Sequence, residues 1–366
     1  MHQQDTVERP PHGLVVVAGY GLKLYVHHGH LIVNDGVGRN RQTRRYHRAT
    51  SKLKRVVVIG HDGYITLEAM RWIRDIGATY VHIDTDANLI ALSAPARHHE
   101  SKLRRAQALA SGDQQGRAAT VALLKAKLEG QASLVERRLA HLKPTVRVKD
   151  ATPITVAAAI RESAAVMHSG LTFTELRKLE SAAGRNYWQT WARVPVRFDS
   201  SWRRGIPDHW HLAGPRTSAA EEKKRARKAT TPVHALLNYT YAILETEATI
   251  AAHKLGFDPS LGLMHVDQRY RSSLATDLME PGRPAADQLV LDVLQSRALS
   301  RGDIVETREG VCRIGPPLAH QLAQLAPDLR RAIAPHAEAL AGALLRNPKS
   351  ATPLTRHNHR SALSRL

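Results

Sequence analysis

The chain has 366 residues, more than a single domain usually holds, and its 53 lysines and arginines against 33 acids give a net charge of +20. So basic a balance favours an anionic polymer such as nucleic acid as partner. The sequence lacks an apolar run of about 18 residues, a signal-like start, and any cysteine besides Cys312. We therefore expect a cytoplasmic protein without a membrane span or intrachain disulfide, in which nitrogen and oxygen hold any metal.

The first hundred residues read as β structure. Residues 13–33 contain β-branched apolar runs broken by glycine and histidine, which predicts meandering antiparallel strands. A buried strand is expected at 55–59, followed by a helix at 66–76 that Thr66 caps and Gly77 ends. Two more strands should flank the turn "DTDAN" that comes next.

Helical patterns take over from Ser101 onward, after Pro95 ends the β region. The sequence therefore predicts an α+β fold in which a β-rich N-terminal part precedes a larger all-α part. The expected units are a β-rich domain at 1–97, an α-helical catalytic domain at 98–338 and a basic, disordered tail at 339–366.

Two basic segments are candidates for contacts with DNA. From Arg39 to Arg55 there are eight basic residues and no acid, which suits a phosphate backbone and equally a polar loop between strands. Residues 193–228 mix Gly, Pro, Trp and basic residues, which predicts a long mobile loop that stacks bases on Trp202 and Trp210, or a surface loop pinned by a tryptophan. The candidate DNA-binding residues are Arg39, Arg41, Arg44, Arg45, Trp202, Arg203, Arg204 and Arg283.

A histidine and two acids lie together in "LGLMHVDQRYRSSLATDLMEPGRP", residues 261–284. Ser272 or Ser273 can cap a helix that places Asp277 and Glu280 on one face, and the following proline, which lacks an N–H, should end or kink that helix. Two such carboxylates repel each other unless a divalent cation or an arginine lies between them. For Arg283 the sequence leaves two roles open, partner of the acids or contact to phosphate.

A third acid comes from a helix far upstream. Thr172 and Glu175 form a capping box, and Glu180 adjoins the apolar stripe of that helix, where a charge needs a partner. The stripe consists of Leu176, Leu179, Ala183 and Tyr187. Glu180, His265 and Glu280 together are a candidate metal site, although acids and histidines on helices are more often solvated or ion-paired.

Five ordered motifs resemble the CRISPR-associated protein one family, the integrase of spacer acquisition. They are "VVVIGHDGYITLEAM" (56–70), "LESAAGRNYW" (179–188), "TPVHALLNYTYAILE" (231–245), "GFDPSLGLMH" (256–265) and "SSLATDLMEPGRP" (272–284), and the resemblance covers roughly residues 13–330. It implies that Glu180, His265 and Glu280 bind Mn²⁺ or Mg²⁺ and that Asp277 is also needed for catalysis. Two departures from the family pattern, His234 and Gly282, touch none of these ligands.

The resemblance also implies an activity and partners. The family members are metal-dependent DNA endonucleases and integrases that join the 3′-hydroxyl ends of captured DNA fragments into a CRISPR repeat by transesterification. They bind double-stranded DNA, form homodimers through the β domain, and flank the small dimeric CRISPR-associated protein two.

Three other interpretations remain open at the level of sequence. A stand-alone metal-dependent nuclease or a transposon integrase would use the same residues. A non-catalytic nucleic-acid scaffold would bind DNA in a salt-sensitive way without them. A nuclease centre at Asp84 and Asp86 competes with a simple turn after a strand.

Overall fold

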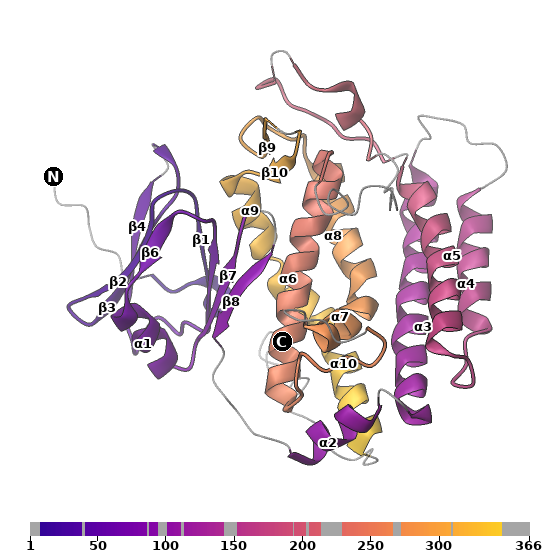
Figure 1. Ribbon diagram of the computed structural model, residues 1–366. Helices are drawn as coiled ribbons and strands as arrows, with labels where there is room; N and C mark the ends of the chain where they lie inside the picture. The colour runs from indigo at the N-terminus through magenta and orange to yellow at the C-terminus, as the bar shows by residue number, and fades with distance from the viewer. Residues whose placement is uncertain are drawn as a thin grey trace, which may run out of the picture.

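The computed structural model describes the chain from residue 8 to residue 345 with ten short gaps. The described ranges are 8–38, 41–85, 88–93, 101–110, 113–142, 152–192, 194–202, 205–213, 229–265, 272–308 and 310–345. Two four-stranded sheets form the N-terminal part, and helices make up most of the rest (Figure 1). The predicted α+β fold, with β structure first and helices after it, is confirmed.

The first sheet has the strand order β1-β5-β7-β8. Its strands are β1 (Leu14–Ala18), β5 (Arg55–Ile59), β7 (Thr79–Ile83) and β8 (Leu89–Ser93). The first three run parallel and β8 returns antiparallel to β7, around the predicted turn. In that turn Asn88 donates hydrogen bonds to both carboxylate oxygens of Asp84, so Asp84 serves the turn, while Asp86 lies outside the described residues.

The second sheet has the order β4-β3-β2-β6. It consists of β2 (Leu22–His27), β3 (His30–Asp35), β4 (Gln42–Tyr46) and β6 (Gly63–Ile65). Strands β2, β3 and β4 are antiparallel neighbours, whereas β6 runs parallel to β2. The antiparallel meander predicted for residues 13–33 is therefore correct for β2 and β3 and wrong for β1, which pairs in parallel with β5.

Strand β1 is buried on both faces, as expected for a parallel strand covered on two sides. Val15 and Val17 pack into a core that the two sheets share with helix α1 (Leu67–Asp75), whereas Val16 packs into the core of the helices. The predicted helix is confirmed, because the hydroxyl of its N-cap Thr66 accepts a hydrogen bond from the backbone of Ala69. One sheet thus joins the two parts of the molecule.

The helical part surrounds one buried helix. Helix α6 (Pro232–Leu255) is buried almost all round, as its apolar composition requires, and Gly256 in the left-handed conformation caps its C-terminal end. Around it lie α2 (Ser101–Ala110), α3 (Gln114–Arg137), α4 (Pro153–Ala165), α5 (Phe173–Trp191), α7 (Ser273–Met279), α8 (Arg283–Ser296), α9 (Pro316–Ala323), α10 (Ala326–Leu345) and the hairpin β9 (Ile304–Glu306) and β10 (Cys312–Ile314). In Figure 1, α3, α4 and α5 stand side by side on the far side of α6 from the sheets.

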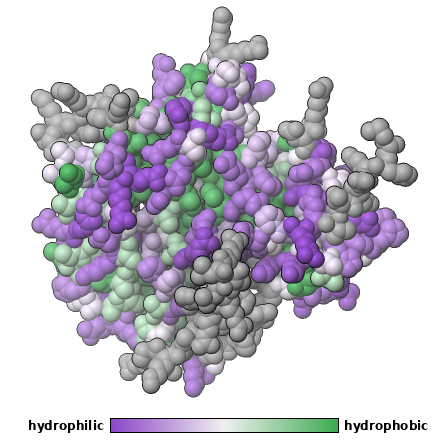
Figure 2. All heavy atoms as spheres, turned by 180° about the vertical axis from the view of Figure 1, so that it is seen from behind, coloured by the Kyte–Doolittle hydropathy of each residue, from purple (hydrophilic) through white to green (hydrophobic). Residues whose placement is uncertain are grey.

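The ends of the predicted units differ in part from the structure. The boundary expected at 97/98 lies in residues 94–100, outside the described residues. Helix α10 continues to Leu345, so the tail predicted from 339 begins too early, because an amphipathic helix persists where we expected no apolar periodicity. No helix in the described part of the chain is long and apolar enough to cross a membrane. Hydrophilic residues dominate the face shown in Figure 2, with smaller apolar areas among them.

Candidate metal and DNA site

Two of the predicted acids meet on one lysine. Glu180 from α5 and Glu280, at the C-terminal end of α7, both form ion pairs with the ammonium of Lys127 on α3, Glu280 at 2.7 Å. The Lys127 side chain is only 8% exposed and that of Glu280 only 5%, whereas Glu180 is 26% exposed. Segments far apart in the sequence thus bring two carboxylates to a single position held by a positive charge, and Glu180 has the partner that its place beside the apolar stripe required.

Electrostatics keep this cluster ionised. Burial alone would raise the pKa of Glu280, but Arg283 and Lys127 outweigh it and lower that pKa to about 2. For Lys127, burial opposes the charge, and the two glutamates still raise its pKa above the usual value. Arg283 donates from Nε to Glu280 at 3.0 Å and lies 4.8 Å from the ring centroid of Tyr241. Of its two predicted roles, the structure therefore supports partner of the acids.

Asp277 holds His265 in place. Its carboxylate accepts backbone hydrogen bonds from Leu263, Met264 and His265 at 2.6, 3.1 and 3.3 Å, and lies 2.5 Å from the imidazole Nδ1. Because Nδ1 is occupied, Nε2 is the nitrogen left to bind a ligand. Asp277 therefore orients the turn and the ring, while Glu280 three residues later faces Lys127, so the two acids do not share one cation.

The break after α7 follows from Pro281, as predicted. Helix α7 ends at Met279, a 3₁₀ turn spans Glu280–Gly282, and α8 starts at Arg283. Gly282, a departure from the family pattern, has a packing reason, because a Cβ there would lie 2.5 Å from Ile333 and 2.8 Å from Leu244. A narrow gap beside the turn is lined by Thr120, Leu123, Leu124, Met264, Asp277 and Glu280, and it has no room for a water molecule.

The predicted three-residue metal site is assembled only in part. Among the described residues, no group of three or more His, Cys, Asp or Glu side chains has the arrangement of a metal site. Nevertheless the residues fit a divalent cation, since two ionised carboxylates already embrace a cationic group and carboxylate with imidazole is a donor set for Mn²⁺ or Mg²⁺. His265 is close enough for its charge to act on Glu280.

The predicted DNA-binding arginines of the first basic segment separate in the structure. Arg44 is buried, 2.5 Å from Asp35, and donates to the carbonyl of Val16, so its partners lie inside the protein and do not support its assignment to DNA. Arg41 is exposed and bonds to the carbonyl of Gly21, and Arg45 lies half-buried with a guanidinium nitrogen 3.4 Å from His30. Arg39 lies outside the described residues.

The tryptophans of the second basic segment pack inside the protein. Trp210 is 1% exposed, donates from its indole N–H to the carbonyl of Thr230 and stacks against Phe198. Trp202 is half-buried against Phe198 and Trp210. The structure therefore supports a segment pinned by tryptophans rather than one that presents Trp210 to bases. Arg203 and Arg204 lie outside the described residues.

Two features of the site were missed from the sequence. Nothing in "LLKAKLEG" distinguishes the buried Lys127 from its half-buried neighbour Lys125. The second is a groove of about 340 Å³ on the outer face of α5, lined by Thr174, Arg177, Lys178, Ser181 and Arg185. The spacing of these five residues along one helix was a sequence signal that could have indicated the groove. The groove lies on the same helix as Glu180, and Arg177 bonds to the carbonyl of Met264 in the turn that carries His265.

Comparisons with known proteins give a consistent result. The family model for CRISPR associated protein Cas1 matches residues 15–324. The chain is 29% identical over 309 residues to the CRISPR-associated endonuclease Cas1 1 of Archaeoglobus fulgidus, covering 82% of this chain and 83% of the relative. Two solved structures share the fold: a casposase bound to an integration product (TM-score 0.70, 19% identity, 92% of each chain) and a Cas6-RT-Cas1–Cas2 complex (TM-score 0.67, 15% identity, 94% of this chain, 36% of that chain).

An α+β fold that gathers buried acids and a histidine inside a basic chain, with such relatives, defines an endonuclease or integrase class of protein. The chain belongs to the CRISPR-associated protein Cas1 family. The resemblance predicted from the five motifs is thereby confirmed.

Proposed function

We propose that this chain is a DNA endonuclease and integrase of CRISPR adaptation that depends on Mn²⁺ or Mg²⁺. It joins the 3′-hydroxyl ends of captured double-stranded DNA fragments to a CRISPR repeat by exchanging one phosphodiester for another. The observation that carries the proposal is the convergence of Glu180 and Glu280 on one cationic position in a chain of net charge +20.

Glu180, Glu280 and the Nε2 atom of His265 would hold the metal. When bound, it favours the alkoxide of the attacking hydroxyl and neutralises charge on the phosphate oxygens. The surrounding residues prepare that position: Asp277 fixes the ring of His265 through Nδ1, and Arg283 keeps Glu280 ionised. No nucleotide is consumed, since the bond broken and the bond formed are both phosphodiesters.

The groove on α5 supplies a place for the DNA backbone. Arg177, Lys178 and Arg185 follow one face of the helix that carries Glu180, so phosphates bound there would pass beside the carboxylates. Arg41, on the edge of the second sheet, is a further candidate contact. The fold shared with a casposase bound to an integration product supports this placement.

The proposed protein partners are a second copy of this chain and CRISPR-associated protein two. We propose a homodimer through the N-terminal sheets that flanks the CRISPR-associated protein two dimer in the cytoplasm. Support comes from the fold shared with a Cas6-RT-Cas1–Cas2 complex.

The test is an integration assay with the chain, its partner, Mn²⁺ and labelled DNA on a plasmid that contains a repeat. Glu280→Gln and His265→Ala should reduce joining by about 10³-fold, since a metal contributes several kcal/mol to such a reaction. Glu136→Gln is the matched control, because Glu136 is an acid on α3 that pairs with Arg161 outside the cluster. Joining by Glu280→Gln at the level of the parent would refute the site. Metal-dependent hydrolysis without joining would favour a stand-alone nuclease.

A further inference from the structure

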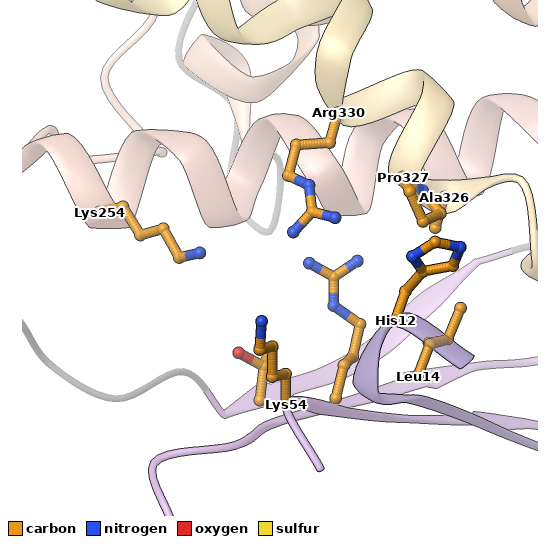
Figure 3. A pocket seen from close by; sticks show the side chains of 9 residues that line it. His12, Leu14, Lys54, Lys254, Ala326, Pro327 and Arg330 are labelled. Carbon is orange, nitrogen blue, oxygen red and sulfur yellow. The ribbon is translucent and has the colours of Figure 1, made fainter. Parts of the chain in front are cut away.

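A second charged site lies between the sheets and the helices. A cavity of about 80 Å³ is lined by His12, Leu14, Lys54, Arg55, Thr79, Lys254, Ala326, Pro327 and Arg330. Arg55 begins strand β5 of the first sheet and Lys54 directly precedes it, while Lys254 lies at the end of α6 and Arg330 in the first turns of α10. Figure 3 shows Lys54, Lys254 and Arg330 extending toward one space from opposite walls, with His12 at its side.

The positive charge of this cavity exceeds what the protein neutralises. Arg55 forms a buried ion pair with Glu247 of α6, whose side chain is 1% exposed. The side chains of Lys54 and Arg330 have no hydrogen-bond or ion-pair partner among the described residues, and no acid lines the cavity. The pKa of Arg55 is lowered mainly by burial and also by the positive charge of Arg330. The pKa of Arg330 is lowered mainly by burial and also by the positive charge of Arg331. These guanidinium groups therefore repel each other across the space.

The lining suits one kind of ligand. Guanidinium and ammonium groups with a nearby hydroxyl, that of Thr79, are donors that match the oxygens of a phosphate. Ala326 and Pro327 add the N-terminal end of the 20-residue helix α10, whose dipole also favours an anion. The volume of about 80 Å³ lies well below the range for small-molecule sites, about 300 to 1,000 Å³, which favours a small anion over a larger ligand.

We infer that this cavity binds a phosphate group, which would bridge Lys54 of the sheet to Arg330 of α10. The cavity shares no residue with the acidic cluster of Lys127, Glu180 and Glu280, so the inference does not depend on the proposed integrase function. The phosphate belongs either to the DNA backbone or to a free anion such as inorganic phosphate or pyrophosphate. Both sources satisfy the same donors.

The first experiment is calorimetric titration of the full chain with inorganic phosphate and with pyrophosphate, at constant ionic strength in chloride. We expect one saturable site, with binding weakened at least about tenfold in Arg330→Gln and in Lys54→Gln, since a charge-assisted hydrogen bond contributes about 1.5–3 kcal/mol. Arg331→Gln is the matched control, because Arg331 is the next residue in the chain and its guanidinium is exposed and paired with Asp328. Equal binding by Arg330→Gln and Arg331→Gln, or no saturable binding by the parent, would overturn the inference.

Loss of folding is separated from loss of the site by two measurements. Removing Arg330 removes a repulsion, so the far-ultraviolet circular dichroism and melting temperature of Arg330→Gln in chloride should match or exceed those of the parent. Phosphate should raise the melting temperature of the parent and of Arg331→Gln but not of Arg330→Gln. A rise of equal size in all three would contradict the assignment.

The second experiment identifies the source of the phosphate. Duplex DNA binding is measured over a series of salt concentrations for the parent and Arg330→Gln. If the DNA backbone occupies the cavity, the slope of log affinity against log salt falls by about one and inorganic phosphate competes with DNA. If a free anion occupies it, the slope is unchanged while phosphate binding is lost. Glu280→Gln should bind phosphate like the parent, so this outcome is distinguishable from failure of the proposed integrase activity.

Discussion

The acidic cluster and the basic cavity differ in how far residues of the protein neutralise the charges gathered there. In the cluster of Lys127, Glu180, Glu280 and Arg283, both glutamates have a protein cation as partner. Beside the cavity Glu247 pairs with Arg55, whereas the side chains of Lys54 and Arg330 have no partner in the part of the chain that is described. One site is neutralised from within, and the other is left with positive charge.

This difference indicates what each site can accept from outside. A divalent ion entering the acidic cluster competes with an ammonium that already holds both carboxylates. An anion entering the basic cavity would meet Lys54 and Arg330, which have no acid partner among the described residues, while Glu247 keeps its pair with Arg55. Metal binding should therefore be weakened by Lys127, whereas anion binding should relieve a repulsion.

The largest expected effect comes from removing Glu247, the acid that pairs with Arg55 beside the basic cavity. Glu247→Gln leaves Arg55 buried without its counter-charge and beside Arg330, which should cost about 3–5 kcal/mol in the free energy of unfolding. Urea unfolding in chloride measures this loss. Phosphate should restore part of it, because an anion in the cavity replaces the missing charge.

The control for this experiment keeps the volume and removes both charges. Arg55→Met combined with Glu247→Met should lose much less stability than Glu247→Gln alone, since well-packed apolar residues often replace a buried ion pair at little cost. If the double variant is as unstable as Glu247→Gln, packing rather than the unpaired charge explains the effect, and the comparison of the two sites fails on the basic side.

The next effect tests the acidic side. Lys127→Met removes the ammonium between Glu180 and Glu280, so the apoprotein should lose roughly 1–3 kcal/mol of stability, less than Glu247→Gln because Glu180 is a quarter exposed. Mn²⁺ should bind more tightly, because the competing ammonium is gone, as measured by calorimetry and by the electron paramagnetic resonance signal of free Mn²⁺. Weaker Mn²⁺ binding would mean that Lys127 supports the ligands instead of competing with the metal.

The sequence predicted those parts of this picture that depend on local rules. The cap at Thr66, the capping box of Thr172 and Glu175, and the break at Pro281 are set by neighbours within four residues, and all are present. The need of Glu180 for a partner followed from its place beside an apolar stripe, but the identity of that partner did not. Lys127 is 53 residues away, and only tertiary packing brings it there.

The same limit explains the errors in the N-terminal part. Alternating and β-branched residues predict a strand, but they do not specify its neighbour, so the parallel pairing of β1 with β5 was not foreseen. From the sequence, the run from Arg39 to Arg55 was interpreted as one basic segment available to phosphate. In the structure, Arg44 and Arg55 form ion pairs with Asp35 and Glu247 inside the protein. Composition identifies a basic segment without showing which of its cations are already neutralised.

That distinction gives a smaller, third prediction. Arg41→Gln should reduce the slope of DNA affinity against salt by about one, with the free energy of unfolding unchanged within about 0.5 kcal/mol, because Arg41 is exposed. Arg44→Gln should lower the free energy of unfolding and leave the salt slope of DNA affinity unchanged, since Arg44 is ion-paired with Asp35. Filter binding across a salt series and urea unfolding measure the two quantities. A change of slope in Arg44→Gln alone would reverse the assignment made from burial.

The smallest effect concerns protons on α10, the helix that contributes Arg330. Burial lowers the pKa of His336, so the folded protein favours its neutral form. This histidine therefore contributes stability that is present above its unfolded pKa of about 6.5 and is lost as the pH falls through the lower folded value. Between pH 7.5 and 5 the parent should lose more stability in urea unfolding than His336→Gln does. Phosphate should not alter that difference, because His336 does not line the cavity; if phosphate abolished it, the anion would act on α10 as a whole rather than through Arg330.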